Sequence, residues 1–447
     1  MKQTLIATLV TVVLFAGCSV DPLISEEETI DQRLVSEILR STSLSHIGQM
    51  AFPNPLDYNQ IPQDPLNQLT REKVDLGRLL YHETSFSTDN LFQETENTYS
   101  CATCHFAEAG FQAGILQGLG EGGLGFGSAG EGRFPAKHLL PSKLDVQPLR
   151  TPSSMNLAYQ VNLLWNGQFG AGGQNSDTYD QWDNVPPTQL NYLGFEGLET
   201  QAIAGIKVHR MNFSQDKVTN SPYQQMFDEA FYDWDESVRY SDTTAGLAIA
   251  AYERTLLAYD APFQRWLRGD YAAMSDEEKE GALLFFGKAN CSDCHSSPAL
   301  SGDGFEAIGL NDFIEGEVFF LLPEGEAFKG RASFTKREED LYKFKIPQLY
   351  NLKDSPFYGH GGSFTDIREL IEYKNRGQAE NPIVSEEQLS PFFVSLGLTN
   401  EEIDQLTSFV ENSLYDPSLD RFVPSSTLSG QCFPNADPIS MEDLGCD

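Results

Sequence analysis

Cys101-Ala102-Thr103-Cys104-His105 is the stretch on which the interpretation of the whole sequence depends. Two thiols three residues apart can form thioethers with the two vinyl groups of one haem, and the histidine that follows is placed to bind the iron. The same spacing returns at Cys291-Ser292-Asp293-Cys294-His295. A single copy is also compatible with a zinc or redox motif. Two copies, in a chain with the features of an exported protein, predict two covalently bound c-type haems.

The charge of the chain excludes several classes of partner. The 447 residues carry a formal net charge of −35. Nucleic acids and anionic lipid surfaces are bound through positive charge, so neither is an expected partner. A strongly acidic surface is either simply well solvated or attractive to a basic electron donor. With 40% hydrophobic residues, the chain is long and apolar enough for two or three domains.

The N-terminus reads MKQTLIATLVTVVLFAGC over residues 1–18. Lys2 precedes an apolar run from Leu5 to Phe15 that is too short to span a bilayer. The small residues before Cys18 resemble the cleavage box of a bacterial lipoprotein, and an ordinary secretory signal is the alternative. We therefore expect a lipoprotein signal peptide, a lipidated Cys18, and a mature chain exported to the periplasmic or outer-membrane surface, with a lipid anchor as its only membrane contact.

The remaining cysteines indicate a disulfide. Of seven cysteines, one is assigned to the lipid and four to the haems, which leaves Cys432 and Cys446 in a tail rich in proline and glycine. Because an exported protein folds where disulfides persist, we expect these two to be paired. No thiol is then left to act as a nucleophile.

Apolar periodicity predicts helices separated by long loops. Apolar residues recur at helical spacing between Ile30 and Leu39, which predicts a short amphipathic helix. Ser275 and Thr399 each begin a capping box, with a glutamate three residues later. We divide the chain into a signal peptide (1–18), a tether with a short helix (19–50), an N-terminal haem domain (51–242), a C-terminal haem domain (243–415) and a disulfide-held tail (416–447).

Several stretches around the two haem motifs resemble bacterial dihaem cytochrome c peroxidases and their MauG-type relatives. They are, in order, residues 69–90, 149–168, 198–211, 252–256 and 344–364. The resemblance covers about residues 50–415. It implies an all-α fold of two cytochrome c-like haem domains with long loops. In that family, the first haem is the reactive one and the second stores or passes electrons.

The resemblance also suggests residues at the first haem. Gln201 matches a family glutamine, but His209 and Arg210 stand where the family has a glutamate, in a segment one residue shorter. Cleavage of peroxide needs a base that moves a proton and a group that stabilises developing negative charge. We expect His209 to be that acid/base, and Arg210 with Gln201 to stabilise the charge. The alternatives for His209 are iron ligation and an ordinary polar role.

Two further residues bear on the first haem. Trp165 falls where the family has an indole between the haems, so we expect it to relay electrons; core packing is the alternative. His138 is a candidate ligand of the first iron in a resting form, but a histidine in a surface loop is the favoured interpretation.

The sixth ligand of the second haem is the main open question. The family usually has methionine there, and this sequence has none between Met274 and Met441. We expect Tyr373 as the ligand, with Lys374 or His360 as alternatives; a phenolate would lower the reduction potential. Many family members also hold a calcium ion between the domains. Here Arg150 replaces the asparagine that binds it, so the sequence leaves open whether calcium is a cofactor.

The leading hypothesis is a dihaem peroxidase that reduces hydrogen peroxide with electrons from a donor cytochrome or another small redox protein. The alternatives are a MauG-type oxidase acting on a protein or small organic substrate, and an electron-transfer lipoprotein without enzymatic activity. A dimer is among the oligomeric states that the sequence allows.

Overall fold

The computed structural model describes residues 28–321 and 323–446. The expected signal peptide, the lipidation site Cys18 and most of the tether lie outside the described residues. Within the described ranges, no helix is long and apolar enough to cross a membrane.

Helices dominate the regular structure, as expected from the sequence. The four strands have two residues each and form two antiparallel pairs, β1 (Gly123–Leu124) with β2 (Phe134–Pro135) and β3 (Phe305–Glu306) with β4 (Phe344–Lys345). A mostly helical fold is therefore confirmed, with these short hairpins as an addition to the all-α expectation. The helices are α1 (Ile30–Thr42), α2 (Arg71–His82), α3 (Gly197–Val208), α4 (Gln215–Thr219), α5 (Gln224–Ala230), α6 (Glu236–Arg239), α7 (Asp242–Arg254), α8 (Pro262–Leu267), α9 (Asp276–Phe286), α10 (Ala332–Thr335), α11 (Ile367–Arg376), α12 (Asn400–Ser408) and α13 (Pro438–Leu444).

Side-chain caps fix where the longer helices begin. Both expected capping boxes are present, with Ser275 at the start of α9 and Thr399 at the start of α12. Thr29 begins α1 in the same way. Each cap satisfies backbone N–H groups that a helix start would otherwise leave unpaired.

Helix α7 organises the first half of the chain, because it packs against both α2 and α3. The approach to α2 is so close that a Cβ on Gly77 would lie 1.8 Å from the carbonyl oxygen of Ala248. Arg254 of α7 pairs with Glu199 of α3 at 2.7 Å, and both side chains are fully buried. Loss of one partner would leave a buried charge without compensation, so this ion pair fixes α3 relative to α7.

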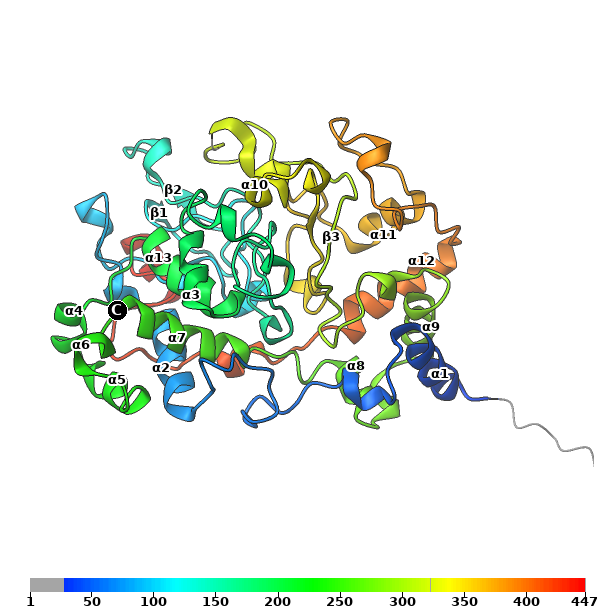
Figure 1. The fold of residues 1–447 in the computed structure, drawn as a ribbon, viewed down its shortest axis with the longest axis horizontal. Coiled ribbons are helices and arrows are strands. Elements are labelled where there is room, and N and C mark those ends of the chain that lie inside the picture. The colour runs from blue at the N-terminus through cyan, green and yellow to red at the C-terminus, as the bar shows by residue number, and fades with distance from the viewer. Residues whose placement is uncertain (1–27, 322, 447) are drawn as a thin grey trace, which may run out of the picture.

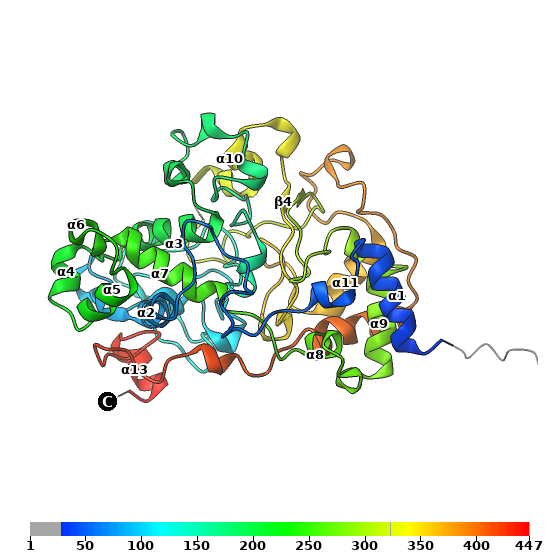
Figure 2. The same ribbon diagram turned by 60° about the horizontal axis from the view of Figure 1, so that its bottom comes forward.

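The helices gather in two groups, with α2 to α7 at one end of the molecule and α8, α9, α11 and α12 at the other (Figure 1). Each terminal segment packs on the half from which it is distant in sequence. Helix α1 lies beside α9 in both views (Figure 2), joined to it by the ion pair between Lys279 and Asp31 at 2.8 Å. Helix α13 lies at the opposite end, beside the first group (Figures 1 and 2).

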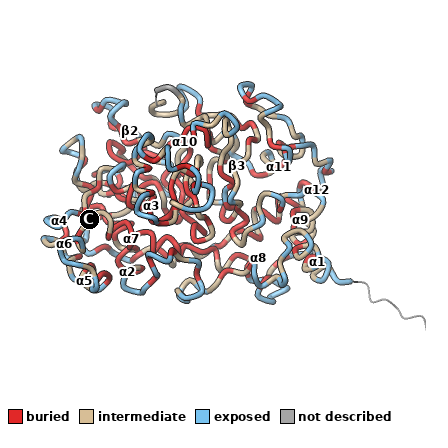
Figure 3. The backbone as a smooth tube through the Cα atoms, in the orientation of Figure 1, coloured by how far each residue is buried: buried red, intermediate tan, exposed pale blue. Residues whose placement is uncertain are grey.

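One apolar cluster extends through both groups, from Leu34 in α1 to Phe422 near the C-terminus. Figure 3 shows the buried backbone concentrated in the middle of the molecule, with the exposed segments at its periphery. The two halves therefore share a core, and the domain boundaries remain a prediction.

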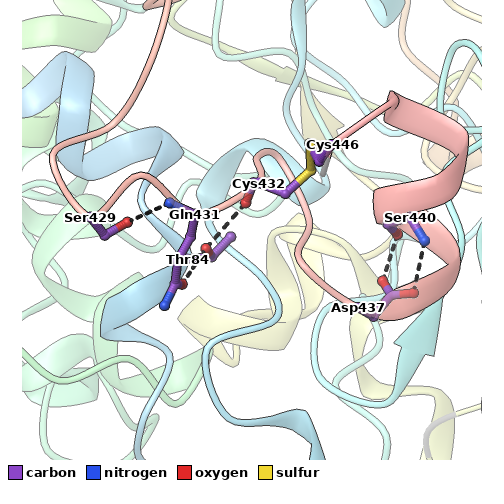
Figure 4. The surroundings of a disulfide bond; sticks show 7 residues. All are labelled: Thr84, Ser429, Gln431, Cys432, Asp437, Ser440 and Cys446. Carbon is purple, nitrogen blue, oxygen red and sulfur yellow. Dashed lines mark hydrogen bonds between the residues drawn. A yellow bond between two sulfur atoms is a disulfide. The ribbon is translucent and has the colours of Figure 1, made fainter.

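The C-terminal tail supports the first haem motif. Cys432 and Cys446 form a disulfide that joins the end of α13 to the preceding loop (Figure 4). Between them, the Pro434 carbonyl accepts hydrogen bonds from the hydroxyls of Ser100 and Thr103 at 3.0 and 3.1 Å. The tail thus lies against the turn that presents the first pair of thiols.

Candidate active site

The first motif forms a short 3-10 turn, Cys101–Thr103, followed by the half-buried imidazole of His105. Burial lowers the pKa of His105 to about 4, so its ring is neutral. Its Nδ1 lies 3.2 Å from the Phe111 carbonyl oxygen. A carbonyl can only accept, so Nδ1 carries the proton and Nε2 keeps its lone pair. This is how proteins orient a histidine that binds a metal.

The second motif repeats this arrangement. Cys291–Asp293 is again a 3-10 turn, the Nδ1 of His295 lies 2.8 Å from the Leu300 carbonyl oxygen, and burial lowers the pKa of His295 to about 4. Both histidines therefore offer Nε2 to an iron. The hydrogen bond from Nδ1 to a backbone carbonyl is therefore present at both motif histidines, which are 190 residues apart in sequence. This repetition supports a common role for the two histidines.

The thiols fit thioether formation better than zinc binding. All four motif cysteines are free, and burial raises the pKa of Cys101, Cys104 and Cys291 to about 12. Within the described residues, no three or more His, Cys, Asp or Glu side chains form a metal-binding group. Cys101, Cys104 and His105 instead line a cavity of about 710 Å³, a volume suited to a large cofactor.

His209 faces this cavity from the end of α3. Its Nδ1 lies 2.9 Å from the carboxylate of Asp145, which is itself 7% exposed. Burial lowers the pKa of His209, but the charge and hydrogen bond of Asp145 outweigh burial and raise it above the ordinary value. His209 and His105 line the same cavity, and the charge of His209 contributes to lowering the pKa of His105.

Gln201 lies on the same face of α3 as His209. A Cβ at Gly205 would lie 3.5 Å from Gln201 Nε2 and 3.9 Å from His209 Cδ2, so the two side chains flank this glycine. Spacings of four residues place all three on one helical face. Both side chains line the cavity, as the sequence predicts.

The expected role of Arg210 is wrong. Arg210 has a left-handed backbone (φ 57°) and is not among the residues that line the cavity. Its guanidinium forms an ion pair with the fully buried Glu121 and donates to the Lys143 carbonyl. The turn that ends α3 directs adjacent side chains to different sides, so His209 reaches the cavity and Arg210 does not.

Trp165 also lines the cavity, and its main chain joins the two halves. Its indole Nε1 donates to the Arg150 carbonyl at 2.7 Å, and its own carbonyl accepts from the Lys345 N–H at 2.8 Å. The Arg150 N–H in turn donates to the His360 carbonyl at 2.8 Å. Trp165 is therefore held between a segment near the first motif and β4 of the second half.

The surroundings of Tyr373 do not support the preference for it over Lys374. The Tyr373 hydroxyl donates to the Ile308 carbonyl, and its ring packs in a cluster with Leu310 and Phe393. The next residue on α11 points about 100° away. Lys374 has no hydrogen-bond or ion-pair partner among the described residues, and its charge acts on the pKa of Cys291, Cys294 and His295. Burial lowers the pKa of Lys374 to about 8, which makes the neutral amine accessible.

The two other candidate histidine ligands are engaged elsewhere. His360 stacks on Phe344 with ring centroids 3.6 Å apart, and its Nε2 lies 3.0 Å from Asp312. His138 lies 3.0 Å from Glu94, and its side chain is 67% exposed. The favoured interpretation of His138 as a surface residue therefore agrees with the structure.

Asp145 is a residue of this cavity that the sequence did not reveal. It lies 64 positions before His209, and no motif surrounds it. Its backbone pairs with Gly120 and Glu121, which brings the segment carrying the carboxylate to the end of α3. Only the folded chain shows that the acid and the imidazole meet.

The chain is similar to known proteins in sequence and in fold. Residues 71–272 match the family model of di-haem cytochrome c peroxidase. The methylamine utilization protein MauG of Methylorubrum extorquens is 28% identical over 366 residues, which cover 80% of this chain and 82% of that protein. Cytochrome c peroxidase Ccp of Escherichia coli is 27% identical over 390 residues, 84% of this chain and 64% of that protein. The crystal structure of a MauG-like protein associated with microbial copper homeostasis has a similar fold, with a TM-score of 0.55, 24% identity, and coverage of 84% and 96% of the two chains.

Proposed function

Because this chain belongs to the dihaem cytochrome c peroxidase and MauG family, we propose that it is an exported, lipid-anchored dihaem peroxidase. It reduces one hydrogen peroxide to two water molecules, with two protons and with two electrons from an external redox protein such as a cytochrome. The observation that carries the proposal is the Asp145–His209 pair, which lines the same cavity as His105.

The residues of the first site have distinct roles in this proposal. Cys101, Cys104 and His105 would hold the haem, which would supply the iron for peroxide reduction. Asp145 accepts a hydrogen bond from the Nδ1–H of His209, so Nε2 holds the lone pair that takes a proton from peroxide and returns it to the leaving oxygen. Gln201, on the same face of α3, offers an amide N–H to that oxygen.

The second site receives the electrons. We assign Cys291 and Cys294 as the residues that would attach the second haem, and His295 and Lys374 as the residues that would bind its iron. The support for Lys374 is its lack of another polar partner and its electrostatic effect on all three groups of the motif. Trp165 is the aromatic residue between the two sites, because its backbone and indole bond to segments of both halves.

Asp145→Asn should lower peroxide turnover by about tenfold to a hundredfold, the usual effect of losing a partner that orients a functional histidine. In the native protein Asp145 raises the pKa of His209, and the base works only when neutral. Activity should therefore fall as pH drops through this pKa. The variant lacks the carboxylate charge, so its activity should fall at a lower pH than that of the native protein. The measurement is the dependence of kcat/KM on pH. A fall in kcat/KM at the same pH in both proteins would show that Asp145 does not control the titration of His209.

Trp165→Phe should separate the two haems kinetically. The variant keeps an aromatic ring but loses the hydrogen bond from Nε1 to the Arg150 carbonyl, at a cost of about 1 kcal/mol of stability. Stopped-flow spectra should show the first haem reacting with peroxide at the native rate while oxidation of the second haem slows. Equal rates for the second haem in both proteins would remove Trp165 from the electron path.

A MauG-type oxidase is the second candidate. The described part of the second site offers Lys374 rather than a methionine, and a nitrogen ligand gives a lower potential than a thioether. A low potential favours storing oxidising equivalents for an organic or protein substrate over accepting electrons from a donor.

Steady-state assays distinguish these functions. A peroxidase should oxidise a reduced small cytochrome continuously when hydrogen peroxide is added. A MauG-type protein should react with peroxide in one turnover and then oxidise the cytochrome poorly. Two low-spin haems without any spectral response to peroxide would contradict both enzymatic functions and leave an electron carrier.

Calcium is not part of the proposal. The Arg150 side chain offers no oxygen ligand, and its guanidinium donates to the carbonyls of Ala113 and Ile115. A divalent cation beside this charge would be repelled. Metal chelators should therefore leave the spectra of both haems unchanged.

A further inference from the structure

The side chains that line the first cavity carry more positive charge than the carboxylates around them compensate. Asp145 is paired with His209, and Glu326 lies 3.7 Å from Lys336. Burial raises the pKa of Glu253 to about 8, so this carboxyl is mostly protonated at neutral pH. Arg150 and Lys345 are the two lining cations that have no carboxylate within ion-pair distance among residues 28–321 and 323–446.

Both unpaired cations are deeply buried. Arg150 is 1% exposed and Lys345 is 5% exposed. Their polar partners are carbonyl oxygens: those of Ala113 and Ile115 for Arg150, and that of Gly302 for Lys345 at 2.7 Å. The Nε of Arg150 has no partner at all. Neutral carbonyls compensate a buried positive charge only in part, so each of these side chains is costly without an anion.

The main chains of the two cationic residues meet at Trp165. The Arg150 carbonyl accepts from the Trp165 indole, and the Lys345 N–H donates to the Trp165 carbonyl. From there the Arg150 side chain extends to the carbonyls of Ala113 and Ile115, and the Lys345 side chain extends to the carbonyl of Gly302. Both cationic residues are therefore tied through their main chains to the tryptophan that joins the two halves.

We propose that Arg150 and Lys345 are the counter-ions of the two propionate groups of the haem in the first cavity. A c-type haem keeps two carboxylates after thioether formation, and this cavity lacks two anions. Guanidinium and ammonium groups are the usual partners of carboxylates, and charge-assisted hydrogen bonds are the strong ones. The proposal thus assigns these carboxylates to two residues whose main chains both bond to Trp165. It rests on the proposed function only in that both need a haem in this cavity.

The test measures the midpoint potential of each haem by spectroelectrochemistry of the holoprotein, without peroxide. Positive charge near a haem stabilises its reduced form, so Arg150→Met and Lys345→Met should each lower the potential of one haem, and the double variant should lower it further. The other haem should stay unchanged. The matched controls Arg150→Lys and Lys345→Arg keep the charge and should stay near the native potential. Haem content and circular dichroism establish that each variant carries two haems and is folded.

Unchanged potentials in a folded double variant with two haems would overturn the proposal, since the carbonyls would then suffice for both cations. If a methionine variant does not mature, resonance Raman spectra of the native protein provide a second test. The propionate bending bands should shift in D₂O, because N–H donors exchange, and bands without a shift would also contradict the proposal. A protein that shows the potential shifts but does not reduce peroxide would refute the proposed function and leave this inference intact.

Discussion

Replacing His209 with alanine should lower kcat/KM for hydrogen peroxide by a factor of about 10² to 10⁴, the range for loss of a general acid/base. The imidazole is the titratable side chain of α3 that lines the cavity with His105, and Asp145 fixes its tautomer. Without it, peroxide must lose its proton to solvent. The haem content and the spectrum of the second haem should not change, because His209 has no contact with the second motif among the described residues.

His138→Ala is the matched control, since it removes the same side chain from an exposed loop. Its peroxide kinetics should equal those of the native protein. His209→Gln adds a second comparison, because an amide can donate a hydrogen bond but cannot take up a proton. A native rate in His209→Ala would rule out His209 as the base. If instead His209→Ala changes the resting spectrum of the first haem to that of an open iron, His209 is an iron ligand.

The parts of this site that sequence predicts are those held within a few residues. Each CxxCH motif contains both thiols and the histidine, so its chemistry can be predicted from the sequence alone. The structure adds only the carbonyls that orient His105 and His295. The capping boxes at Ser275 and Thr399 are local in the same sense and are present.

The parts that sequence misses depend on direction and on distant contacts. His209 and Arg210 are adjacent, yet the left-handed conformation of Arg210 sends its guanidinium to Glu121. Tyr373 and Lys374 differ by one position, which on a helix is a rotation of about 100°. Asp145 acquires its role only because the fold brings its loop to the end of α3. None of these outcomes is encoded in residue type or spacing alone.

Lys374→Met should change the second haem from nitrogen to thioether ligation and raise its midpoint potential, on the order of a tenth of a volt. The side chain of Lys374 has no other polar partner among the described residues, and methionine has a similar length, so helix α11 should be preserved. The measurement is spectroelectrochemistry, combined with EPR and near-infrared spectra of the ferric protein, which distinguish amine, phenolate and thioether ligands. The first haem should keep its potential.

Tyr373→Phe is the control that distinguishes the two neighbours. It removes the hydroxyl that donates to the Ile308 carbonyl and should cost about 1 kcal/mol of stability without changing either haem spectrum. If Tyr373→Phe loses the native spectrum of the second haem while Lys374→Met keeps it, the ligand is the Tyr373 phenolate and not Lys374. The functional consequence follows from the same variant: a higher second-haem potential eases electron uptake from a donor. Faster cytochrome oxidation by Lys374→Met would therefore mean that the lysine holds this haem at a potential suited to oxidising a substrate, as in the MauG-type alternative.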